Sequence, residues 1–466
     1  MAWLLNLVYL AIMACAAPWL LYSALRKGKY REGWSERFLG WVPVRDSQRR
    51  CVWLHAVSVG EVNLLQTILA GIEREYPDWD VVISSTTAAG YALAKKRYAP
   101  RSVCYAPLDF SWAVNNVLKR VRPDLLLLAE LEVWPNLLRA AKRQGVHVVV
   151  VNGRLGEQSC RGYRRLRWLV RPTFASIDFV AAQSEVYANR FRDLGCPANR
   201  VHVTGSLKFD GAQSVRGNPI TQRLAKLADI ARDDVVFLAG STQAPEEGLA
   251  LAAFEKLSTE FPRLKLILVP RHPERFREVA GLLDRRGLAW QRRSALTCSE
   301  FGPANVATDQ RTEPPRILLV DAVGELGAWW GTAQIAFVGG SFGKRGGQNM
   351  IEPAAYGAAV SFGPNTWNFR DVVTLLTSNK AAVVVNNGDE LERFVRRCLM
   401  QPGYAAELGR RAAQLVQQQQ GATQQTMQLL KNLIDPPNAE VIRRIDAPQS
   451  PGNAATNGSA TRRRAV

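Results

Sequence analysis

The chain has 466 residues, of which 47% are hydrophobic and 22% are charged. This composition excludes a disordered polymer, a collagen and a disulfide-stapled miniprotein, and the length predicts about two or three domains. The formal net charge of +19 favours an anionic partner, which can be nucleic acid, an anionic membrane surface or a phosphorylated substrate. The seven cysteines form no CxxC pair. This argues against a zinc site or a disulfide framework and favours a reducing, cytosol-facing compartment.

The amino-terminal segment 1–25 carries no charged side chain and is about long enough to cross a bilayer as a helix. Trp3, Trp19 and Tyr22 stand near its ends, as interfacial aromatic residues do. Basic residues follow at once: Arg26, Lys27, Lys29 and Arg31. Positive charge on this side predicts that the remaining chain is cytoplasmic. A cleaved signal peptide would need basic residues before the apolar run, so we expect a spanning helix, with a helix in the membrane interface as the alternative.

Short apolar runs alternate with amphipathic stretches after residue 50. The strands predicted in the first half are Val52–His55, Val81–Ser84, Val103–Tyr105, Leu125–Glu130, His147–Asn152, Phe179–Ala182 and Val201–Thr204. The helices predicted between them include Val62–Tyr76, Gly90–Tyr98, Ala113–Arg120 and Trp134–Gln144. This alternation predicts a parallel sheet that is covered by helices on both faces.

A second series of the same kind follows a polar stretch that contains Gly and Pro. Its predicted strands are Val235–Ala239, Leu264–Val269, Ile317–Val320, Ile335–Val338, Ala359–Phe362 and Ala382–Val385. We therefore predict an α/β fold with two Rossmann-like, doubly wound domains that face a cleft. The expected parts are an anchor (1–25), an amino-terminal domain (26–210), a linker (211–220), a carboxyl-terminal domain (221–400), helices that pack back toward the amino-terminal domain (401–434), and a disordered basic tail (435–466).

The motif HAVSVGE at residues 55–61 follows a predicted strand and opens a predicted helix. Functional groups of parallel sheets gather beyond the carboxyl ends of the strands. Gly60 permits close approach of the backbone, Ser58 can cap the helix, and Glu61 can accept a proton from a substrate hydroxyl. The alternative is that Glu61 only complements the helix dipole, which would lower its pKa and weaken it as a base.

Two carboxylates, Glu130 and Glu132, end the apolar run at residues 125–129. They share one face of the strand if the extended backbone continues. Burial of a carboxylate is costly unless it is paired. A role in the cleft and a structural pairing with an arginine are therefore equally open, while Pro135 predicts the end of the strand and the start of the next helix.

An arginine-rich amphipathic region follows. Its basic residues are Arg154, Arg161, Arg164, Arg165, Arg167 and Arg171, and they are interleaved with Tyr163, Leu166 and Trp168. This pattern favours contact with anionic lipid or phosphate, and it would also suit nucleic acid. A solvated helix face is the alternative.

Four motifs of the second half follow successive predicted strands. They are AGST at 239–242, PRH at 270–272, VGGSF at 338–342 and GGQNMIEP at 346–353. Arg271 can neutralise a phosphate and His272 can donate to it, while N–H groups of glycine turns and helix starts can cradle one. The sequence contains no GxxxxGK[ST] loop, which disfavours a P-loop NTPase, and its four histidines form no metal-ligand motif.

Together with VNGR at 151–154, GSLKFD at 205–210 and GPNTWNF at 363–369, these motifs resemble the Kdo transferases of lipopolysaccharide assembly. Gln243 and Ala322 depart from the family pattern, in which a His and a Thr are common at these places. The resemblance implies a GT-B glycosyltransferase with an N-terminal membrane-anchor helix. Its members transfer 3-deoxy-D-manno-oct-2-ulosonic acid (Kdo) from CMP-Kdo to a lipid A precursor, with inversion at the anomeric carbon and without a metal or another cofactor.

The same resemblance implies that Glu61 is the general base and that Glu130 supports it in the acceptor site. The residues implied to bind CMP-Kdo are Ser241, Pro270, Arg271, His272, Gly324, Glu325, Gly340, Ser341, Asn349 and Glu352. The residues implied to bind the acceptor or a phosphate are Ser58, Gly60, Arg154 and Lys208. The implied partners are CMP-Kdo, a lipid A precursor and the anionic inner membrane, with the catalytic domains on its cytoplasmic side.

Two alternatives stay open at this point. Another GT-B transferase with a lipid acceptor, or a sugar-nucleotide epimerase, would share the predicted fold. A membrane-bound nucleic-acid-binding protein would explain the net charge and the arginine-rich region. It would not explain Glu61, the two carboxylates at Glu130 and Glu132, or the ordered glycine turns, so we expect no nucleic-acid partner.

Overall fold

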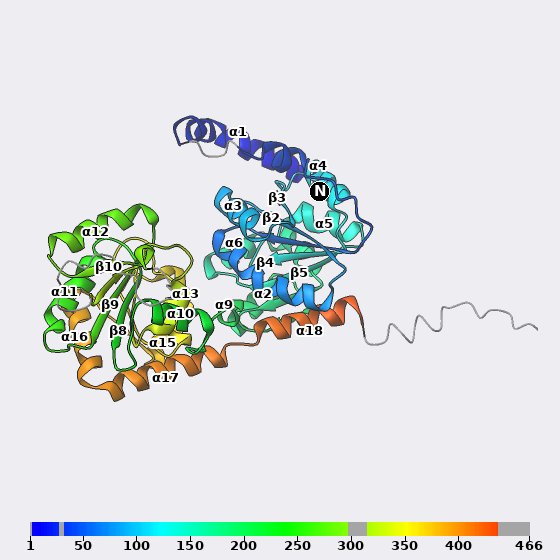
Figure 1. Cartoon of the computed structure of the whole chain (residues 1–466). Coiled ribbons are helices and arrows are strands. Elements are labelled where there is room, and N and C mark those ends of the chain that lie inside the picture. Colours follow the sequence, from blue (N-terminus) through cyan, green and yellow to red (C-terminus); the bar gives the residue numbers. More distant parts are fainter. Residues whose placement is uncertain (1, 28–31, 297–314, 437–466) are drawn as a thin grey trace, which may run out of the picture.

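The computed structural model of the chain describes residues 2–27, 32–296 and 315–436 (Figure 1). The predicted basic tail therefore lies, from residue 437 onward, outside the described residues, as do Lys29, Arg31 and Cys298. The described cysteines are all free thiols.

The first half of the chain forms a seven-stranded sheet with the order β3-β2-β1-β4-β5-β6-β7, and all its pairs are parallel. Its strands are β1 (Cys51–Ala56), β2 (Asp80–Ser85), β3 (Ser102–Tyr105), β4 (Leu125–Ala129), β5 (His147–Gly153), β6 (Phe179–Ala182) and β7 (Val201–Val203). Its helices are α2 (Val59–Glu75), α3 (Ala88–Arg97), α4 (Ser111–Val121), α5 (Pro135–Arg143), α6 (Glu157–Arg165), α7 (Arg167–Ala175), α8 (Glu185–Leu194) and α9 (Leu207–Asp210). We call this part the amino-terminal lobe.

The second half forms another parallel seven-stranded sheet, with the order β10-β11-β9-β8-β12-β13-β14. Its strands are β8 (Val235–Thr242), β9 (Leu264–Pro270), β10 (Trp290–Arg292), β11 (Ile317–Leu319), β12 (Ile335–Val338), β13 (Ala359–Phe362) and β14 (Ala382–Val384). Its helices are α10 (Pro219–Leu227), α11 (Glu246–Ser258), α12 (Phe276–Arg285), α13 (Leu326–Trp329), α14 (Ile351–Ala355), α15 (Arg370–Ser378) and α16 (Gly388–Met400). We call this part the carboxyl-terminal lobe.

Both sheets are buried on both faces, as the continuous apolar runs predict. Side chains of β1 alternate between two cores, with Trp53 in one and Val52 and Leu54 in the other. In the second sheet, Phe237 and Leu238 face opposite cores in the same way. In each sheet the first strand, β1 or β8, lies in the middle, between strands that continue in opposite directions across the sheet. This switch in strand order opens a crevice at the carboxyl ends of the strands.

Every run that we predict as a strand forms one, with small shifts at the ends. The largest shift is at β8, which continues to Thr242. The sequence did not predict β10, because its three residues are one tryptophan and two polar side chains. The α/β prediction with two doubly wound sheets is confirmed, whereas the exact domain limits stay predictions.

Two carboxyl-terminal helices connect the lobes. Helix α17 (Pro402–Gln418) packs on the carboxyl-terminal lobe, and α18 (Ala422–Ile434) packs on α2 and α9 of the amino-terminal lobe. Figure 1 shows them, in orange and red, along one side of both lobes. The carboxylate of Asp210 accepts a hydrogen bond from Gly421 N (2.7 Å) and another from Thr423 N, and it so fixes the start of α18.

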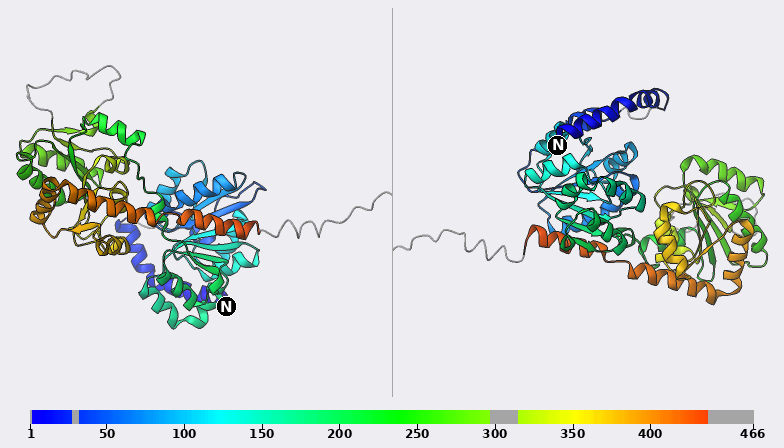
Figure 2. Two further views of the ribbon diagram at one scale, coloured as in Figure 1. Left: turned by 90° about the horizontal axis from the view of Figure 1, so that it is seen from below. Right: turned by 180° about the vertical axis from the view of Figure 1, so that it is seen from behind.

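The apolar helix α1 (Ala2–Lys27) lies on the side of the amino-terminal lobe opposite α18 (Figures 1 and 2). Its window Ala2–Trp19 is long and apolar enough to cross a membrane, by length and composition. Two of its polar groups bind the lobe. Asn6 Nδ2 donates to Ser111 Oγ (2.8 Å), and the Tyr9 hydroxyl donates to Asp109 Oδ2 (3.0 Å). The amino-terminal part of α1 is therefore docked on the lobe.

Candidate active site

A cavity of about 830 Å³ lies between the two lobes. The predicted site residues that line it from the amino-terminal lobe are Ser58, Gly60, Glu61, Glu130, Arg154 and Lys208. Those that line it from the carboxyl-terminal lobe are Ser241, Arg271, Gly324, Asn349 and Glu352. The fold thus brings residues more than 200 positions apart in the chain to one cavity, with a carboxylate on each wall.

Glu61 stands at the start of α2, directly after the carboxyl end of β1. Ser58 is the N-cap, because its Oγ accepts a hydrogen bond from Glu61 N (3.4 Å). In return, the Ser58 hydroxyl donates to Glu61 Oε1 (2.8 Å) and Val57 N donates to Glu61 Oε2 (2.9 Å). This reciprocal arrangement is a variant of the capping box, in which the carboxylate binds the N–H of Val57 and not that of the N-cap Ser58, and it fixes the position of the carboxylate at the cavity wall.

The environment of Glu61 makes it a stronger base than an ordinary glutamate. Burial is the largest effect and raises its pKa; the hydrogen bonds from Val57 and Ser58 oppose this effect, and the negative charges of Glu130 and Glu132 add to it. The balance is a raised pKa. The helix start therefore does not weaken Glu61 as a base, contrary to the alternative that the sequence left open.

The two carboxylates after β4 do not share a strand face. The strand ends at Ala129, and Glu130 has a left-handed backbone with φ 57°. Glu130 lines the cavity, whereas Glu132 accepts from Trp134 Nε1 (2.9 Å) and faces His55 Nε2 at 3.9 Å. In the described part of the chain, no arginine lies within ion-pair distance of either carboxylate, so the pairing with arginine that we considered is not found.

Left-handed backbone at residues other than glycine recurs around the cavity. Glu130, Asn152 and Ser241 have φ between 54° and 57°, a conformation that costs about 1–3 kcal/mol per residue and gathers at functional sites. Asn152 Oδ1 accepts from Leu207 N (3.0 Å), so it positions α9, which carries Lys208. Of the three, only Asn152 is a residue type that favours left-handed backbone, so the sequence does not signal this strain at Glu130 and Ser241.

The wall of the carboxyl-terminal lobe combines a cation with a buried carboxylate. Arg271 follows β9, and its N–H donates to Thr242 O (3.0 Å). Glu352 lies in the first turn of α14 and accepts from Asn349 Nδ2 (2.9 Å). Burial raises the pKa of Glu352, while the Asn349 bond and the positive charge of Arg271 oppose that rise. Such a pair can bind a phosphate and a sugar hydroxyl side by side.

The glycine turn after β12 corrects one of our expectations. The N–H groups of Gly340 and Ser341 donate to Glu246 Oε2 (2.7 Å) and Oε1 (2.8 Å), and Gln243 N and Phe342 N donate to the same carboxylate. Neither Gly340 nor Ser341 lines the cavity. Their N–H groups bind a buried glutamate of the chain, so the structure does not place them as a cradle for a phosphate. This long-range contact has no signal in the sequence.

Three further predicted donor residues lie off the cavity wall. Glu325 accepts from Arg293 Nε and Nη2 (both 2.8 Å) and from Trp329 Nε1 (3.1 Å), so it supports the loop that begins at Gly324. His272 Nε2 lies 3.5 Å from Arg345 Nη2, and Pro270 is the buried last residue of β9. None of the three is among the residues that line the cavity.

The two predicted phosphate-binding cations of the amino-terminal lobe reach toward the other lobe. Arg154 Nη2 lies 3.7 Å from Asp371 Oδ2, which also accepts from the Tyr187 hydroxyl (2.9 Å). Lys208 Nζ lies 5.9 Å from the ring centre of Phe369. Both cations therefore stand where the lobes meet. Within residues 2–27, 32–296 and 315–436, no group of three or more His, Cys, Asp or Glu could hold a metal ion.

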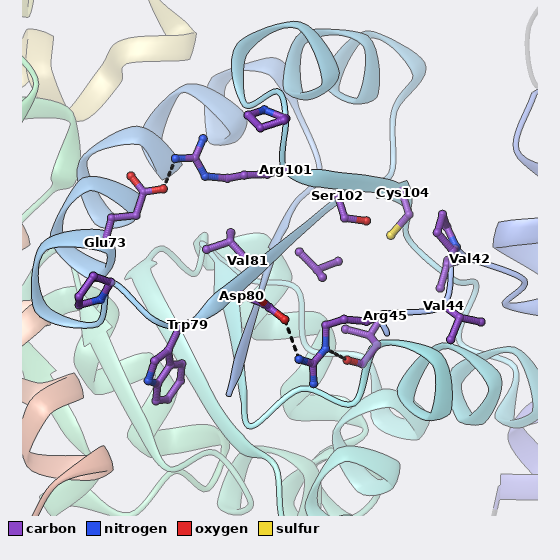
Figure 3. A pocket seen from close by; sticks show the side chains of 15 residues that line it. Val42, Val44, Arg45, Glu73, Trp79, Asp80, Val81, Arg101, Ser102 and Cys104 are labelled. Atoms are coloured by element: carbon purple, nitrogen blue, oxygen red, sulfur yellow. Dashed lines mark hydrogen bonds and ion pairs between the residues drawn. The ribbon is translucent and has the colours of Figure 1, made fainter. Parts of the chain in front are cut away.

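A smaller cavity of about 380 Å³ lies elsewhere on the amino-terminal lobe (Figure 3). It opens near Asp80 and Ser102, at the amino ends of β2 and β3, and so lies away from the carboxyl ends that face the cleft. Its charged groups are paired with each other. Arg45 binds Asp80 (2.8 Å), and another ion pair joins Arg101 and Glu73, as Figure 3 shows. The large cavity between the lobes is therefore the candidate active site.

Comparison with known proteins agrees with this geometry. Residues 32–211 match a family model described as 3-Deoxy-D-manno-octulosonic-acid transferase (kdotransferase). The chain is 34% identical to the 3-deoxy-D-manno-octulosonic acid transferase of Bordetella pertussis, over 82% of this chain and 87% of the relative. It is 30% identical to the enzyme of the same name from Chlamydia trachomatis serovar D, over 93% of this chain and 98% of the relative.

Among solved structures, a glycosyltransferase from Rickettsia africae ESF-5 is similar, with a TM-score of 0.51 and 12% sequence identity. The match covers 84% of this chain and 100% of the Rickettsia chain. This likeness shows the shared fold alone. The identity to full-length relatives goes further, because it extends over both lobes and the cavity between them. The chain belongs to the 3-deoxy-D-manno-octulosonic acid (Kdo) transferases and is a glycosyltransferase of the GT-B fold.

Proposed function

We propose that the chain transfers Kdo from CMP-Kdo to a phosphorylated lipid A precursor at the cytoplasmic face of the inner membrane, with inversion at the anomeric carbon. One observation carries the proposal. Glu61, a carboxylate with a raised pKa, lines the same cavity as the cation Arg271, which belongs to the opposite lobe. A base and a stabiliser of the leaving group on opposite walls are what a single inverting displacement requires.

In the proposed reaction, Glu61 removes the proton of an acceptor hydroxyl as its oxygen attacks the anomeric carbon of Kdo. The bond between that carbon and the phosphate oxygen of CMP breaks, and the electron pair leaves with the phosphate. Arg271 stabilises the negative charge that develops on CMP. Burial raises the pKa of Glu61, and the negative charge of Glu130 adds to that rise. Asn349 and Glu352 would hold hydroxyl groups of the donor.

Helix α1 and the arginine-rich region beside it support the proposed membrane attachment. Leu166 and Trp168 of this region are 50% and 74% exposed, and α7 packs on α5, which carries the partner of Asn6 at Asn136. An apolar helix and a basic surface with exposed apolar side chains therefore lie on neighbouring parts of the lobe. Such a combination suits an anionic membrane surface.

We further propose that α1 lies in the membrane interface and does not span the bilayer. This differs from the spanning helix that the sequence predicts. Asn6 and Tyr9, in the first third of the helix, are hydrogen-bonded to the catalytic lobe. A spanning orientation with a cytoplasmic lobe would carry these residues to the far side of the membrane. Because they bind the lobe, the whole helix stays on one side.

The proposed function is tested with the full chain in detergent, with CMP-Kdo generated in the assay and a tetra-acylated lipid A precursor. Mass spectrometry of the lipid should show addition of Kdo by the wild type. Glu61→Gln keeps the size of the side chain and removes the base, so we expect a loss of about 10²- to 10⁴-fold in kcat.

The matched control is Glu407→Gln, which removes the same charge from a partly exposed site on α17, away from the cavity between the lobes. It should leave the rate unchanged. A folded wild type that adds no Kdo would contradict the proposed donor and acceptor. Transfer that survives in Glu61→Gln would keep the family and contradict the assignment of the base.

A further inference from the structure

Arg97, at the carboxyl end of α3, reaches across the surface of the amino-terminal lobe to α2. Its Nη1 donates to Asn63 Oδ1 and its Nη2 donates to Gln66 Oε1. All three side chains line the cavity between the lobes. Arg97 could not be selected from the sequence, because it belongs to none of the motifs described above.

The charge of Arg97 is oriented but not neutralised. Its two partners are neutral amide oxygens, and among the described residues no carboxylate lies within ion-pair distance of it. By contrast, Arg154 on the same cavity faces Asp371, and Arg271 lies beside Glu352. A guanidinium group has five N–H donors, so the two amide bonds leave Nε–H and one N–H on each terminal nitrogen for a ligand. This arrangement suits bidentate binding of a phosphate.

The position of Arg97 relates it to the proposed base. Asn63 and Gln66 follow Glu61 in α2 by two and five residues, which correspond to about 3 Å and 7.5 Å along the helix axis. Along the axis of α2, the guanidinium is therefore displaced from Glu61 by about the width of one sugar unit. It lies on the amino-terminal lobe, across the cavity from Arg271 and Glu352, where the donor is expected.

We propose that Arg97 is a specificity-determining residue that binds a phosphate group carried by the acceptor sugar. The inference rests on the proposed function, since it takes the acceptor to be a phosphorylated glycolipid. Asn63 and Gln66 hold the guanidinium plane toward the cavity. The phosphate contact then places the neighbouring hydroxyl of the acceptor at Glu61.

The test compares Arg97→Gln with Arg97→Lys and with the control Lys96→Gln. The control removes the same charge one position away, at an exposed side chain outside the cavity wall. Each protein is assayed at saturating CMP-Kdo with the fully phosphorylated acceptor and with acceptors that lack one phosphate or the other. Acceptor binding without the donor is measured in parallel.

We expect Arg97→Gln to raise KM for the fully phosphorylated acceptor about 10- to 100-fold, with KM for CMP-Kdo unchanged and Arg97→Lys in between. On one of the dephosphorylated acceptors, wild type and variant should converge, because the contact is already missing. An equal loss on all acceptors, or a loss no larger than in Lys96→Gln, would overturn the proposal.

Two further arms separate other outcomes. If Arg97→Gln weakens binding to phosphatidylglycerol vesicles and leaves KM for the acceptor unchanged, the phosphate belongs to bulk lipid and the proposal fails. If the wild type transfers no Kdo, the proposed function fails. In that case, weaker binding of the phosphorylated glycolipid by Arg97→Gln still supports the role of Arg97, and equal binding overturns it.

Discussion

Glu61 combines two roles that its sequence context presents as alternatives. Its carboxylate completes the capping box of α2 and at the same time lines the cavity between the lobes. Burial and two neighbouring carboxylates raise its pKa. A group that is held by the backbone keeps its position, and a raised pKa makes it better at removing a proton from a hydroxyl.

The pH profile tests this account of Glu61. As the base, Glu61 must be ionised, so kcat falls as the pH drops through its pKa. The variant Glu130→Gln removes a negative charge that raises this pKa. The pKa then falls, and the acidic limb of the kcat profile moves to lower pH. The measurement is the midpoint of that limb, which does not depend on the height of the profile.

Glu407→Gln again serves as the control, because it removes a carboxylate that is on α17 and does not line the cavity. Its acidic limb should coincide with that of the wild type. A limb that stays in place in Glu130→Gln, or moves to higher pH, would show that another group controls the profile.

At the level of elements, the local sequence pattern predicts those helices and strands whose formation depends on neighbouring residues. The strands were predictable because parallel strands that are buried on both faces read as continuous apolar runs. The start of α2 was predictable because Ser58 and Glu61 have the spacing of a capping box. These two facts place Glu61 at a strand end, where sites of α/β folds lie.

Contacts between distant segments were not predictable from the pattern. The carboxylate of Glu246 fills the turn at Gly340, 94 residues away, and no periodicity encodes that pairing. The spacing of Glu130 and Glu132 predicts that both lie on one strand face, but the left-handed backbone of Glu130 ends the strand before them. The guanidinium of Arg97 joins α3 to α2 over 34 residues. Each of these features depends on how helices and strands from distant parts of the sequence pack together.

The orientation of α1 gives a prediction at this scale. We replace Cys15, the exposed cysteine among the described residues, by Ser and introduce Trp3→Cys at a side chain that is 81% exposed. A membrane-impermeant maleimide should label the new thiol in inverted vesicles and not in right-side-out spheroplasts. The reason is that Asn6 and Tyr9 hold this end of the helix on the lobe.

Cys298, which lies outside the described residues, is replaced by Ser in every protein of this test. The unlabelled control carries Trp3 and lacks Cys15 and Cys298, and it should give no signal in either preparation because the other described cysteines are buried. Labelling of the Trp3→Cys thiol from the periplasmic side would contradict the interfacial orientation and restore the spanning helix.

For the whole molecule, the chain crosses between the lobes twice. It leaves the amino-terminal lobe after α9 and returns at α18, and Asp210 joins these two places by accepting from Gly421 N and Thr423 N. Gln420 Nε2 also donates to Phe209 O (3.2 Å). The carboxylate acts as an N-cap for α18, although it lies 211 residues before the helix in the chain.

Asp210→Ala should therefore lower the free energy of unfolding of this region by about 1–2 kcal/mol. Hydrogen exchange should become faster in α18 and in the facing part of α2, and stay unchanged in α11 and α16. Asp233→Ala, which removes a carboxylate from an exposed pair with Arg263, is the matched control. Unchanged exchange in α18 would contradict the capping role.

Because Asp210 and Gly421 are hydrogen-bonded, the two crossings lie side by side and would act as a single hinge. Two bodies that are joined at adjacent points can bend about that place, whereas sliding past each other would break the joint. The hinge lies on the side of α17 and α18, and α1 lies on the opposite side of the amino-terminal lobe (Figures 1 and 2). Bending would open the cavity away from α17 and α18, which is the direction from which the lipid acceptor of the proposed function would arrive.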